Sequence, residues 1–176
     1  LEIEGLFVFE PRVFEDERGA FFESFNLARF REATGLDVDF VQDNHSISHR
    51  NVLRGLHYQV DPHAQGKLVR VVHGAAWDVA VDIREGSPTF GKWAAVELTA
   101  QNRKQFWIPP GFAHGFLALE DDTHFLYKTT AYWHKDSERT IRWDDPTIAV
   151  SWPIAEKPVL SEKDASGPLI QQRPVT

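Results

Sequence analysis

Cysteine is absent from the 176 residues of this sequence. Disulfide bonds and thiolate metal sites are therefore excluded, and nothing points to an oxidising compartment. The chain also lacks an N-terminal apolar region of the signal type. It has no apolar run long enough to cross a bilayer, since residues 6–9 match only a strand in length. These absences predict a cytoplasmic protein with no membrane partner.

Positive charge is scarce, because 19 Lys and Arg residues stand against 26 Asp and Glu residues and the formal net charge is -7. A protein that coats nucleic acid needs a basic surface to displace counterions, so we expect no nucleic-acid partner. An anionic small molecule would bind only where basic side chains gather in a local pocket.

Apolar and aromatic residues are plentiful, at 42% and 12% of the chain. With this length, they suit a single domain over residues 1–176 with a sizeable core. Short strand-like segments recur between turn signals, which predicts an all-β sandwich or jelly roll with one or two short helices. One helix is expected between the capping residue Asn26 and Gly35, and residues 161–164 can begin at most one further turn.

The stretch at residues 52–72 carries the strongest chemical signal. It contains two strand-like segments separated by a turn around Asp61 and Gly66. If these strands pair as a hairpin, Arg54, His57 and Lys67 can point toward one pocket. A candidate base beside two cations suits the formation and stabilisation of an enolate.

The strand expected at residues 75–83 has two different faces. Trp77 and Val79 lie on an apolar face, whereas Asp78 and Asp82 lie on the opposite one. We expect the apolar face to pack in the core and the acidic face to be wet or functional.

The eight histidines raise the possibility of a metal site. A cupin-type metal site needs a His-x-His pair on one strand and a later histidine after Pro-x-Gly. His114 follows Pro109 and Gly111, but Gln59 stands where the second histidine after His57 is needed. We therefore predict no metal. The remaining histidines are expected to be surface or hydrogen-bonded structural residues: His45, His49, His63, His73, His124 and His134.

Structural interpretations of the candidate residues remain open from the pattern alone. His57 can be a satisfied core histidine, and Arg54 and Lys67 can be ordinary surface cations. Tyr127 can simply pack in the core with its hydroxyl hydrogen-bonded, and the charged run at residues 162–164 can be a solvated turn. Composition alone does not distinguish these structural roles from catalytic ones.

Several linked motifs resemble those of the dTDP-4-dehydrorhamnose 3,5-epimerase family, in the same order and from about residue 11 to residue 168. The motifs are DERGAFFE (16–23), FVQDNHS (40–46), RGLHYQ (54–59), AQGKLVR (64–70), DVAVDIR (78–84) with SPTFG (87–91), IPPGFAHGF (108–116) and FLYK (125–128). The resemblance implies a cupin-like jelly-roll homodimer that exchanges N-terminal strands. It also implies epimerisation of a dTDP-4-keto-6-deoxy sugar in dTDP-L-rhamnose synthesis, without a cofactor or a metal.

The resemblance also implies roles for individual residues. His57 is similar to the general base, Tyr127 to the general acid, Asp164 to the carboxylate that orients His57, and Lys67 to the lysine that stabilises the enolate. The implied substrate-binding residues are Arg18, Glu23, Gln42, Asp43, Asn44, Arg54, Lys67, His114, Trp133, Glu138 and Lys163. Arg18 is expected to come from the partner chain. Trp133 stands where many relatives have tyrosine, so it can stack on a ring but cannot donate a phenol proton.

The implied reaction follows from the chemistry of a 4-keto sugar. The hydrogens at C3 and C5 are both α to the carbonyl, so one site can invert both carbons if a base removes each proton and an acid returns it on the opposite face. The presence of His57, Tyr127 and Asp164 together favours this double epimerisation. The alternatives are a C3-only epimerase, a nucleotide-sugar ketoisomerase, a metal-dependent cupin or a noncatalytic sugar-binding module.

Overall fold

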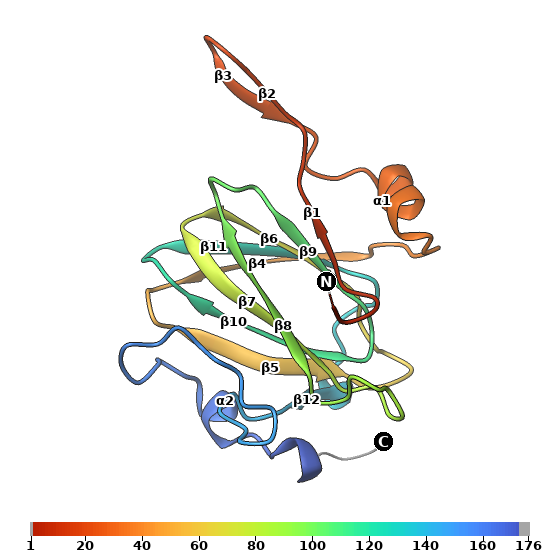
Figure 1. Ribbon diagram of the computed structural model, residues 1–176, viewed down its shortest axis with the longest axis vertical. Helices are drawn as coiled ribbons and strands as arrows, with labels where there is room; N and C mark the ends of the chain where they lie inside the picture. The colour runs from red at the N-terminus through yellow and green to blue at the C-terminus, as the bar shows by residue number, and fades with distance from the viewer. Residues whose placement is uncertain (1, 173–176) are drawn as a thin grey trace.

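The computed structural model describes residues 2–172 and arranges them around two five-stranded antiparallel sheets, shown as two layers in Figure 1. The first sheet has the order β1 (Phe7–Phe9), β9 (Gln105–Ile108), β6 (Lys67–His73), β11 (Thr123–Thr129) and β4 (Gln42–Ser48). The second has the order β12 (Glu138–Thr140), β5 (Leu53–Gln59), β10 (Phe112–Ala118), β7 (Ala75–Asp82) and β8 (Trp93–Thr99). The predicted all-β jelly-roll class is confirmed. The predicted domain over residues 1–176 includes residues 1 and 173–176, which lie outside the described residues.

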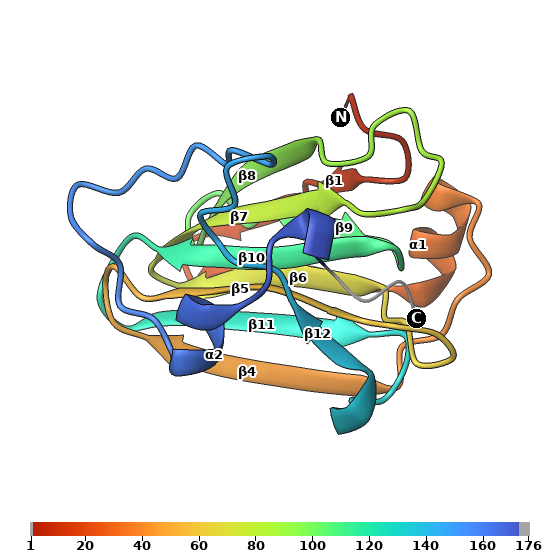
Figure 2. The same ribbon diagram turned by 90° about the horizontal axis from the view of Figure 1, so that it is seen from below.

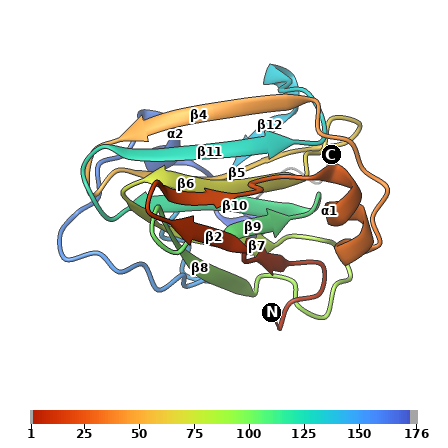
Figure 3. The same cartoon turned by 90° about the horizontal axis from the view of Figure 1, so that it is seen from above.

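A small two-stranded arm, made of β2 (Val13–Asp16) and β3 (Gly19–Phe22), projects away from these layers. Figure 3 looks onto the side of the molecule from which the arm extends. The helix α1 (Leu27–Thr34) follows, beside the first sheet. Its bounds confirm the sequence prediction, because the Asn26 side chain accepts a hydrogen bond from the backbone of Arg29 and Gly35 ends the helix at a φ of 71°.

The remaining helical segments lie in the C-terminal part of the chain. They are α2 (Glu162–Ser166) and the short 3-10 helices η1 (Lys135–Ser137) and η2 (Ile170–Gln172). In Figure 2 the C-terminal segment, coloured blue, runs over the outer face of the second sheet. Within the described part of the chain, no helix is long and apolar enough to cross a membrane.

The predicted hairpin between β5 and β6 is wrong. β5 pairs with β10 and β12, whereas β6 pairs with β9 and β11, so the two strands belong to opposite sheets. The connection at residues 60–66 is much longer than the two-residue loops that typically join hairpin strands. It carries the chain from one layer to the other, where the backbone N–H of Gly66 bonds to the hydroxyl of Thr130 at 2.8 Å.

Strand β7 is buried on both faces, so of the two alternatives expected for its acidic face, wet or functional, the structure excludes the first. Val79 and Val81 pack on the outer side of the sheet with Ile141 and Ile148 of the C-terminal segment. The opposite face points between the sheets, where its alanines join the main core. Asp78 and Asp82 lie on that inner face and are both fully buried. Two carboxyl groups are therefore held inside the barrel and need partners there.

Candidate active site

A cavity of about 510 Å³ opens between the two sheets and receives side chains from both of them. Strands β4, β6 and β11 supply one wall, strands β5, β10 and β12 supply the other, and α2 closes one side. Of the residues predicted from the sequence, the cavity is lined by Gln42, Asn44, Arg54, His57, Lys67, His114, Tyr127, Trp133, Glu138, Lys163 and Asp164. Arg54, His57 and Lys67 thus converge as expected, but they do so across two sheets and not within a hairpin.

His57 is held by a carboxylate from the distant helix α2. Its Nε2 lies 2.5 Å from Oδ1 of Asp164, which is almost completely buried. Ser161 positions this acid by capping α2, because its hydroxyl accepts the backbone N–H of Asp164 at 3.1 Å. Burial alone would raise the pKa of Asp164, but the hydrogen bond and charge of His57 outweigh it and lower that pKa. Since an ionised carboxylate only accepts, Nε2 carries the proton and Nδ1 is the basic nitrogen.

Tyr127 reaches the same cavity from β11, in the sheet opposite His57. Burial raises the pKa of its phenol, and the nearby charge of Glu138 raises it further, while Arg54 acts in the opposite direction. The phenol therefore stays protonated near neutral pH and can donate a proton. Arg54 is oriented by Ser48, whose hydroxyl accepts its Nε–H at 3.1 Å.

Lys67 and His114 form the buried polar part of the cavity wall. Burial lowers the pKa of Lys67 to about 8, and the charges of Asp78 and Glu138 limit that fall. The Lys67 ammonium donates to the backbone oxygen of His57 at 3.4 Å, which places a cation beside the candidate base. His114 bonds through Nε2 to Oδ2 of Asp78 at 2.8 Å. Burial is the main cause that lowers the pKa of His114, so its ring is neutral.

Charged and aromatic groups surround the cavity opening. Lys163 forms an ion pair with Glu138 at 2.8 Å, so this acid is neutralised locally. Burial would raise the pKa of Glu138, but Lys163 lowers it and keeps the carboxylate ionised. Trp133 is more than half exposed, and its backbone N–H bonds to the Gln42 side chain at 3.0 Å. This tryptophan presents a flat apolar surface that a base or a sugar ring can stack on.

Three predicted site residues are not among the residues that line the cavity: Arg18, Glu23 and Asp43. Asp43 alternates with Gln42 and Asn44 along β4 and therefore points to the outer face of the sheet, where it pairs with Lys128 at 2.9 Å. Arg18 pairs with Asp16 at the tip of the arm, and its side chain is 90% exposed.

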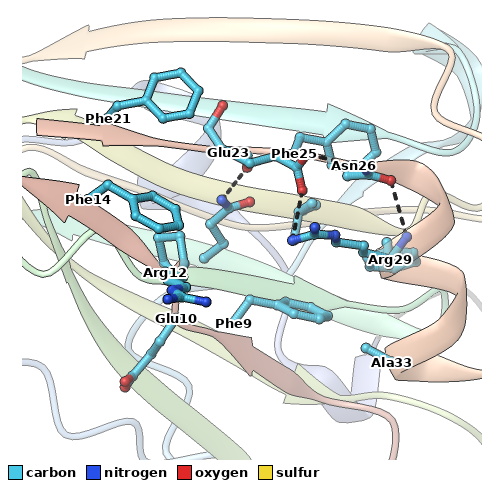
Figure 4. Close-up of a pocket in the computed structure, with 15 residues that line it drawn as sticks. Phe9, Glu10, Arg12, Phe14, Phe21, Glu23, Phe25, Asn26, Arg29 and Ala33 are labelled. Atoms are coloured by element: carbon cyan, nitrogen blue, oxygen red, sulfur yellow. Dashed lines mark hydrogen bonds and ion pairs between the residues drawn. The ribbon is translucent and has the colours of Figure 1, made fainter.

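Glu23 lines a different hollow of about 450 Å³, which lies between the arm and α1 (Figure 4). There it forms an ion pair with Arg29 at 3.3 Å and accepts a hydrogen bond from Asn26. Phe14 and Phe21 of the arm border the same hollow. Within one chain, Arg18 and Glu23 are therefore separated from the residues that carry acid–base chemistry.

The cavity wall also contains residues that the sequence analysis did not assign: Ser46, Tyr58, Gln59, Gln65, Phe116 and Ser161. Ser46 follows Gln42 and Asn44 in the two-residue period of β4, so alternation along the strand could have identified it. Gln59, where a cupin-type metal site would have a histidine, instead holds the loop after β11. Its amide accepts the backbone N–H of His134 at 2.8 Å and donates to the carbonyl of Tyr132 at 3.2 Å.

This arrangement can move protons on a negatively charged ligand. A histidine with a free basic nitrogen and a protonated phenol enter from opposite walls, a lysine lies beside them, and two further cations line the same space. The fold and site together define a jelly-roll enzyme with an acid–base active site.

Comparison with known proteins gives the family. A model of dTDP-4-dehydrorhamnose 3,5-epimerase matches residues 1–172. The epimerase of that name from Shigella flexneri is 58% identical over 166 residues, which cover 94% of this chain and 91% of the relative. The one from Pseudomonas aeruginosa is 57% identical and covers 95% of this chain and 92% of its own length. This chain belongs to the dTDP-4-dehydrorhamnose 3,5-epimerase family and is an isomerase, which confirms the resemblance.

Solved structures agree in fold over nearly the whole chain. A 3,5-epimerase from Legionella pneumophila, in complex with dTDP-4-keto-L-rhamnose, superposes with a TM-score of 0.95 at 50% identity and covers 98% of this chain and 91% of its own. A 3'-monoepimerase from Streptomyces bikiniensis, in complex with dTDP-quinovose, has a TM-score of 0.92 at 37% identity and covers 97% and 86%. Enzymes that invert one or two carbons thus share this fold, so the fold alone does not tell them apart.

Proposed function

We propose that this protein inverts C3 and C5 of dTDP-4-dehydro-6-deoxy-D-glucose and releases dTDP-4-dehydro-L-rhamnose, in the synthesis of dTDP-L-rhamnose. The observation that carries the proposal is the entry of His57 and Tyr127 into one cavity from opposite sheets, with Lys67 beside them. Family membership supports the substrate class, because the Legionella relative binds the corresponding dTDP-4-keto-L-rhamnose. Location in the cytoplasm stays a prediction of the sequence.

The proposed chemistry begins with His57. Its Nδ1 removes the proton from a carbon next to the keto group, and the bonding electrons move to the keto oxygen to give an enolate. Asp164 stabilises the imidazolium that forms, because its carboxylate accepts the Nε2–H. Lys67 donates to the enolate oxygen, a type of interaction that contributes roughly 3 to 4 kcal/mol in comparable sites.

Tyr127 completes the inversion by giving its proton to the opposite face of the same carbon. The electron pair of the enolate forms the new C–H bond, and the keto group is restored. The phenolate that remains is near the Arg54 guanidinium, which favours the ionised form. The pair is ready for the second carbon when the proton on His57 returns to Tyr127 through water, so no electrons are gained or lost.

We also propose that the active enzyme is a homodimer whose arm completes the partner's binding site. The arm leaves two large aromatic side chains open to solvent, since Phe14 is 52% exposed and Phe21 is 73% exposed. Arg18 at its tip is not among the residues that line the cavity of its own chain. A diphosphate carries a negative charge that an added arginine would bind strongly.

Heavy water tests the proposed function directly. The protein is incubated with dTDP-4-keto-6-deoxyglucose in heavy water, and deuterium is followed at both carbons by NMR. We expect deuterium at C3 and at C5 together with the inverted product. Deuterium at C3 alone would favour the single epimerase, whose fold this chain shares. Binding without any exchange would favour a noncatalytic sugar-binding module.

A further inference from the structure

Asp78 is a buried carboxyl group to which the proposed mechanism gives no role. It lies on the inner face of β7 and is fully buried, directly behind the cavity wall. Its Oδ2 accepts from Nε2 of His114 at 2.8 Å. Its other oxygen, Oδ1, has no hydrogen-bond partner among the described residues. A buried carboxylate oxygen without a partner costs free energy of folding, so the presence of Asp78 at this position needs a reason other than packing.

Asp82, four residues along the same strand, shows what a purely structural carboxylate looks like here. It is equally buried, but both of its oxygens are bonded. Arg84 contacts it through a two-pronged interaction, and the hydroxyls of Ser87 and Thr89 each donate to Oδ2 at 2.6 Å. Asp82 thus fixes the loop after β7. Asp78 fixes no loop and instead contacts a residue that lines the cavity.

We propose that Asp78 is a positioning residue that holds His114 in a single tautomer and supplies the counter-charge that keeps Lys67 cationic in the cavity wall. The inference rests on the proposed role of Lys67 at the enolate oxygen. His114 lies on β10, diagonally across from Asp78 on β7, which is the arrangement in which neighbouring strands bring side chains together. Asp78 is also the strongest electrostatic influence in favour of the Lys67 ammonium.

The tautomer has a chemical consequence for the substrate. Burial raises the pKa of Asp78, while the charge and hydrogen bond of His114 and the charge of Lys67 oppose that rise. In the ionised form that the proposal assigns to Asp78, the carboxylate can only accept, so the proton of the neutral His114 ring sits on Nε2. The remaining ring nitrogen, Nδ1, therefore has a lone pair and no proton. It can accept a hydrogen bond from a sugar hydroxyl but cannot donate one to the enolate oxygen. Donation to that oxygen is then left to Lys67, which explains why the charge of Lys67 must be protected.

Several charged groups act on Lys67, and Asp78 is the one that lies on the inner face of β7. Glu138 on β12 also favours the ammonium, whereas Lys163 on α2 opposes it. The other titratable or charged side chains that share the cavity are Arg54, His57, His114, Tyr127 and Asp164. Glu138 is already paired with Lys163 at 2.8 Å, so removal of Asp78 would leave Lys67 without a comparable counter-charge.

The pH dependence of kcat/KM in the wild type and in Asp78→Asn tests the charge half of the proposal. In the wild type we expect kcat/KM to fall above about pH 8, because Lys67, whose pKa is about 8, loses its proton there. In Asp78→Asn the fall should begin at lower pH by about one unit or more. Activity at the wild-type optimum should drop about 10- to 100-fold, as when other supporting carboxylates are removed.

Asp82→Asn is the matched control, since it makes the same substitution on the same strand at the same burial. It should lower the melting temperature but leave the alkaline fall where the wild type has it. An Asp78→Asn profile that falls at the wild-type pH would overturn the proposal, and so would an equal displacement in Asp82→Asn. Either result would mean that Asp78 is protonated or merely structural.

NMR tests the tautomer half without turnover and without a variant of Asp78. In wild-type protein with 15N-labelled histidine, His114 is assigned by the signal lost in His114→Gln. We expect its proton on Nε2 at neutral pH, and a proton on Nδ1 would refute the proposal. Labelled lysine in the same samples reads the titration of Lys67 without substrate. Failure of the proposed function would appear separately, as a wild-type protein that shows both NMR signatures but no turnover.

Discussion

Two regions of the molecule differ in whether their functional side chains have partners within the same chain. These regions are the cavity between the sheets and the projecting arm. In the cavity, His57 and His114 each already have a buried carboxylate partner, Asp164 at 2.5 Å and Asp78 at 2.8 Å. On the arm, Arg18 is paired within residues 2–172 with Asp16, two residues away, and both side chains are more than half exposed. The machinery for moving protons is therefore built inside a single chain. For the arm, the contact that would complete it is the proposed one with the partner chain.

This difference suggests a division between rate and affinity. Groups that act on the reacting atoms must be held rigidly before the substrate arrives, and His57, Lys67 and Tyr127 accordingly sit on paired strands. A group that only binds the diphosphate can be supplied by another chain, because its contribution is the same in the ground state and the transition state. Changes in the cavity should thus lower kcat, and changes in the arm should raise KM.

His57→Ala should give the largest effect. It removes the proposed base and leaves Asp164 buried without its partner, so we expect kcat to fall about 10³- to 10⁴-fold. Uptake of deuterium from heavy water should be lost at both carbons. The control is His73→Ala, which changes an exposed histidine at the end of β6 and should keep the wild-type rate. Full activity in His57→Ala would end its assignment as the base.

Tyr127→Phe should have the next largest effect. The ring still fills its place in the wall, but no proton can be returned to the opposite face, so net inversion should fall about 10²-fold. Because His57 is intact, deuterium exchange at C3 or C5 should be reduced less than net inversion is. Tyr132→Phe alters an exposed phenol nearby and should change neither quantity. Equal losses of exchange and inversion in Tyr127→Phe would count against a separate acid.

Arg18→Ala should have the smallest effect. Loss of one charge-assisted contact to the diphosphate should raise KM about 10-fold with kcat almost unchanged. Arg50→Ala, which alters an exposed arginine after β4, serves as the control. An unchanged KM in Arg18→Ala would remove the arm from the binding site.

Mixed dimers decide which cavity the arm serves. Co-expressed Arg18→Ala and His57→Ala chains form some dimers in which the cavity with an intact His57 receives an intact Arg18 from its partner. Those dimers should restore the wild-type KM with about half of the wild-type sites. If the arm acts only within its own chain, co-expression should leave both the raised KM of Arg18→Ala and the lost activity of His57→Ala unrestored.

The wrong prediction of a hairpin and the excluded alternative of a wet face on β7 have a common cause. The local pattern predicted strands near residues 53–59 and 67–73, but it could not predict their pairing. Each strand could form a hydrogen-bonded ladder with any neighbour whose apolar face matched its own. Likewise, alternation in β7 separated Asp78 and Asp82 from the valines correctly. It carried no information on whether the acidic face would meet water or the opposite sheet.

Most of the cavity wall was nevertheless predictable, through the family motifs and not through spacing. The link between His57 and Asp164 joins residues 107 positions apart, which no local pattern can reveal. The placement of Asp43 away from the cavity depends on the direction of a single side chain on β4. The contact between Asp78 and His114 was not predicted, since nothing near either residue in the sequence marks the other.

The sequence by itself determined the short strands, the capped helix after Asn26 and the set of acids, bases and cations, because turn, cap and strand preferences act over a few neighbouring residues. Only the tertiary structure decided which strands share a sheet, that His57 and Tyr127 enter one cavity from opposite walls, and that Asp78 lies behind His114. Those outcomes depend on the joint burial of side chains far apart in the chain, which is a property of the whole packed barrel.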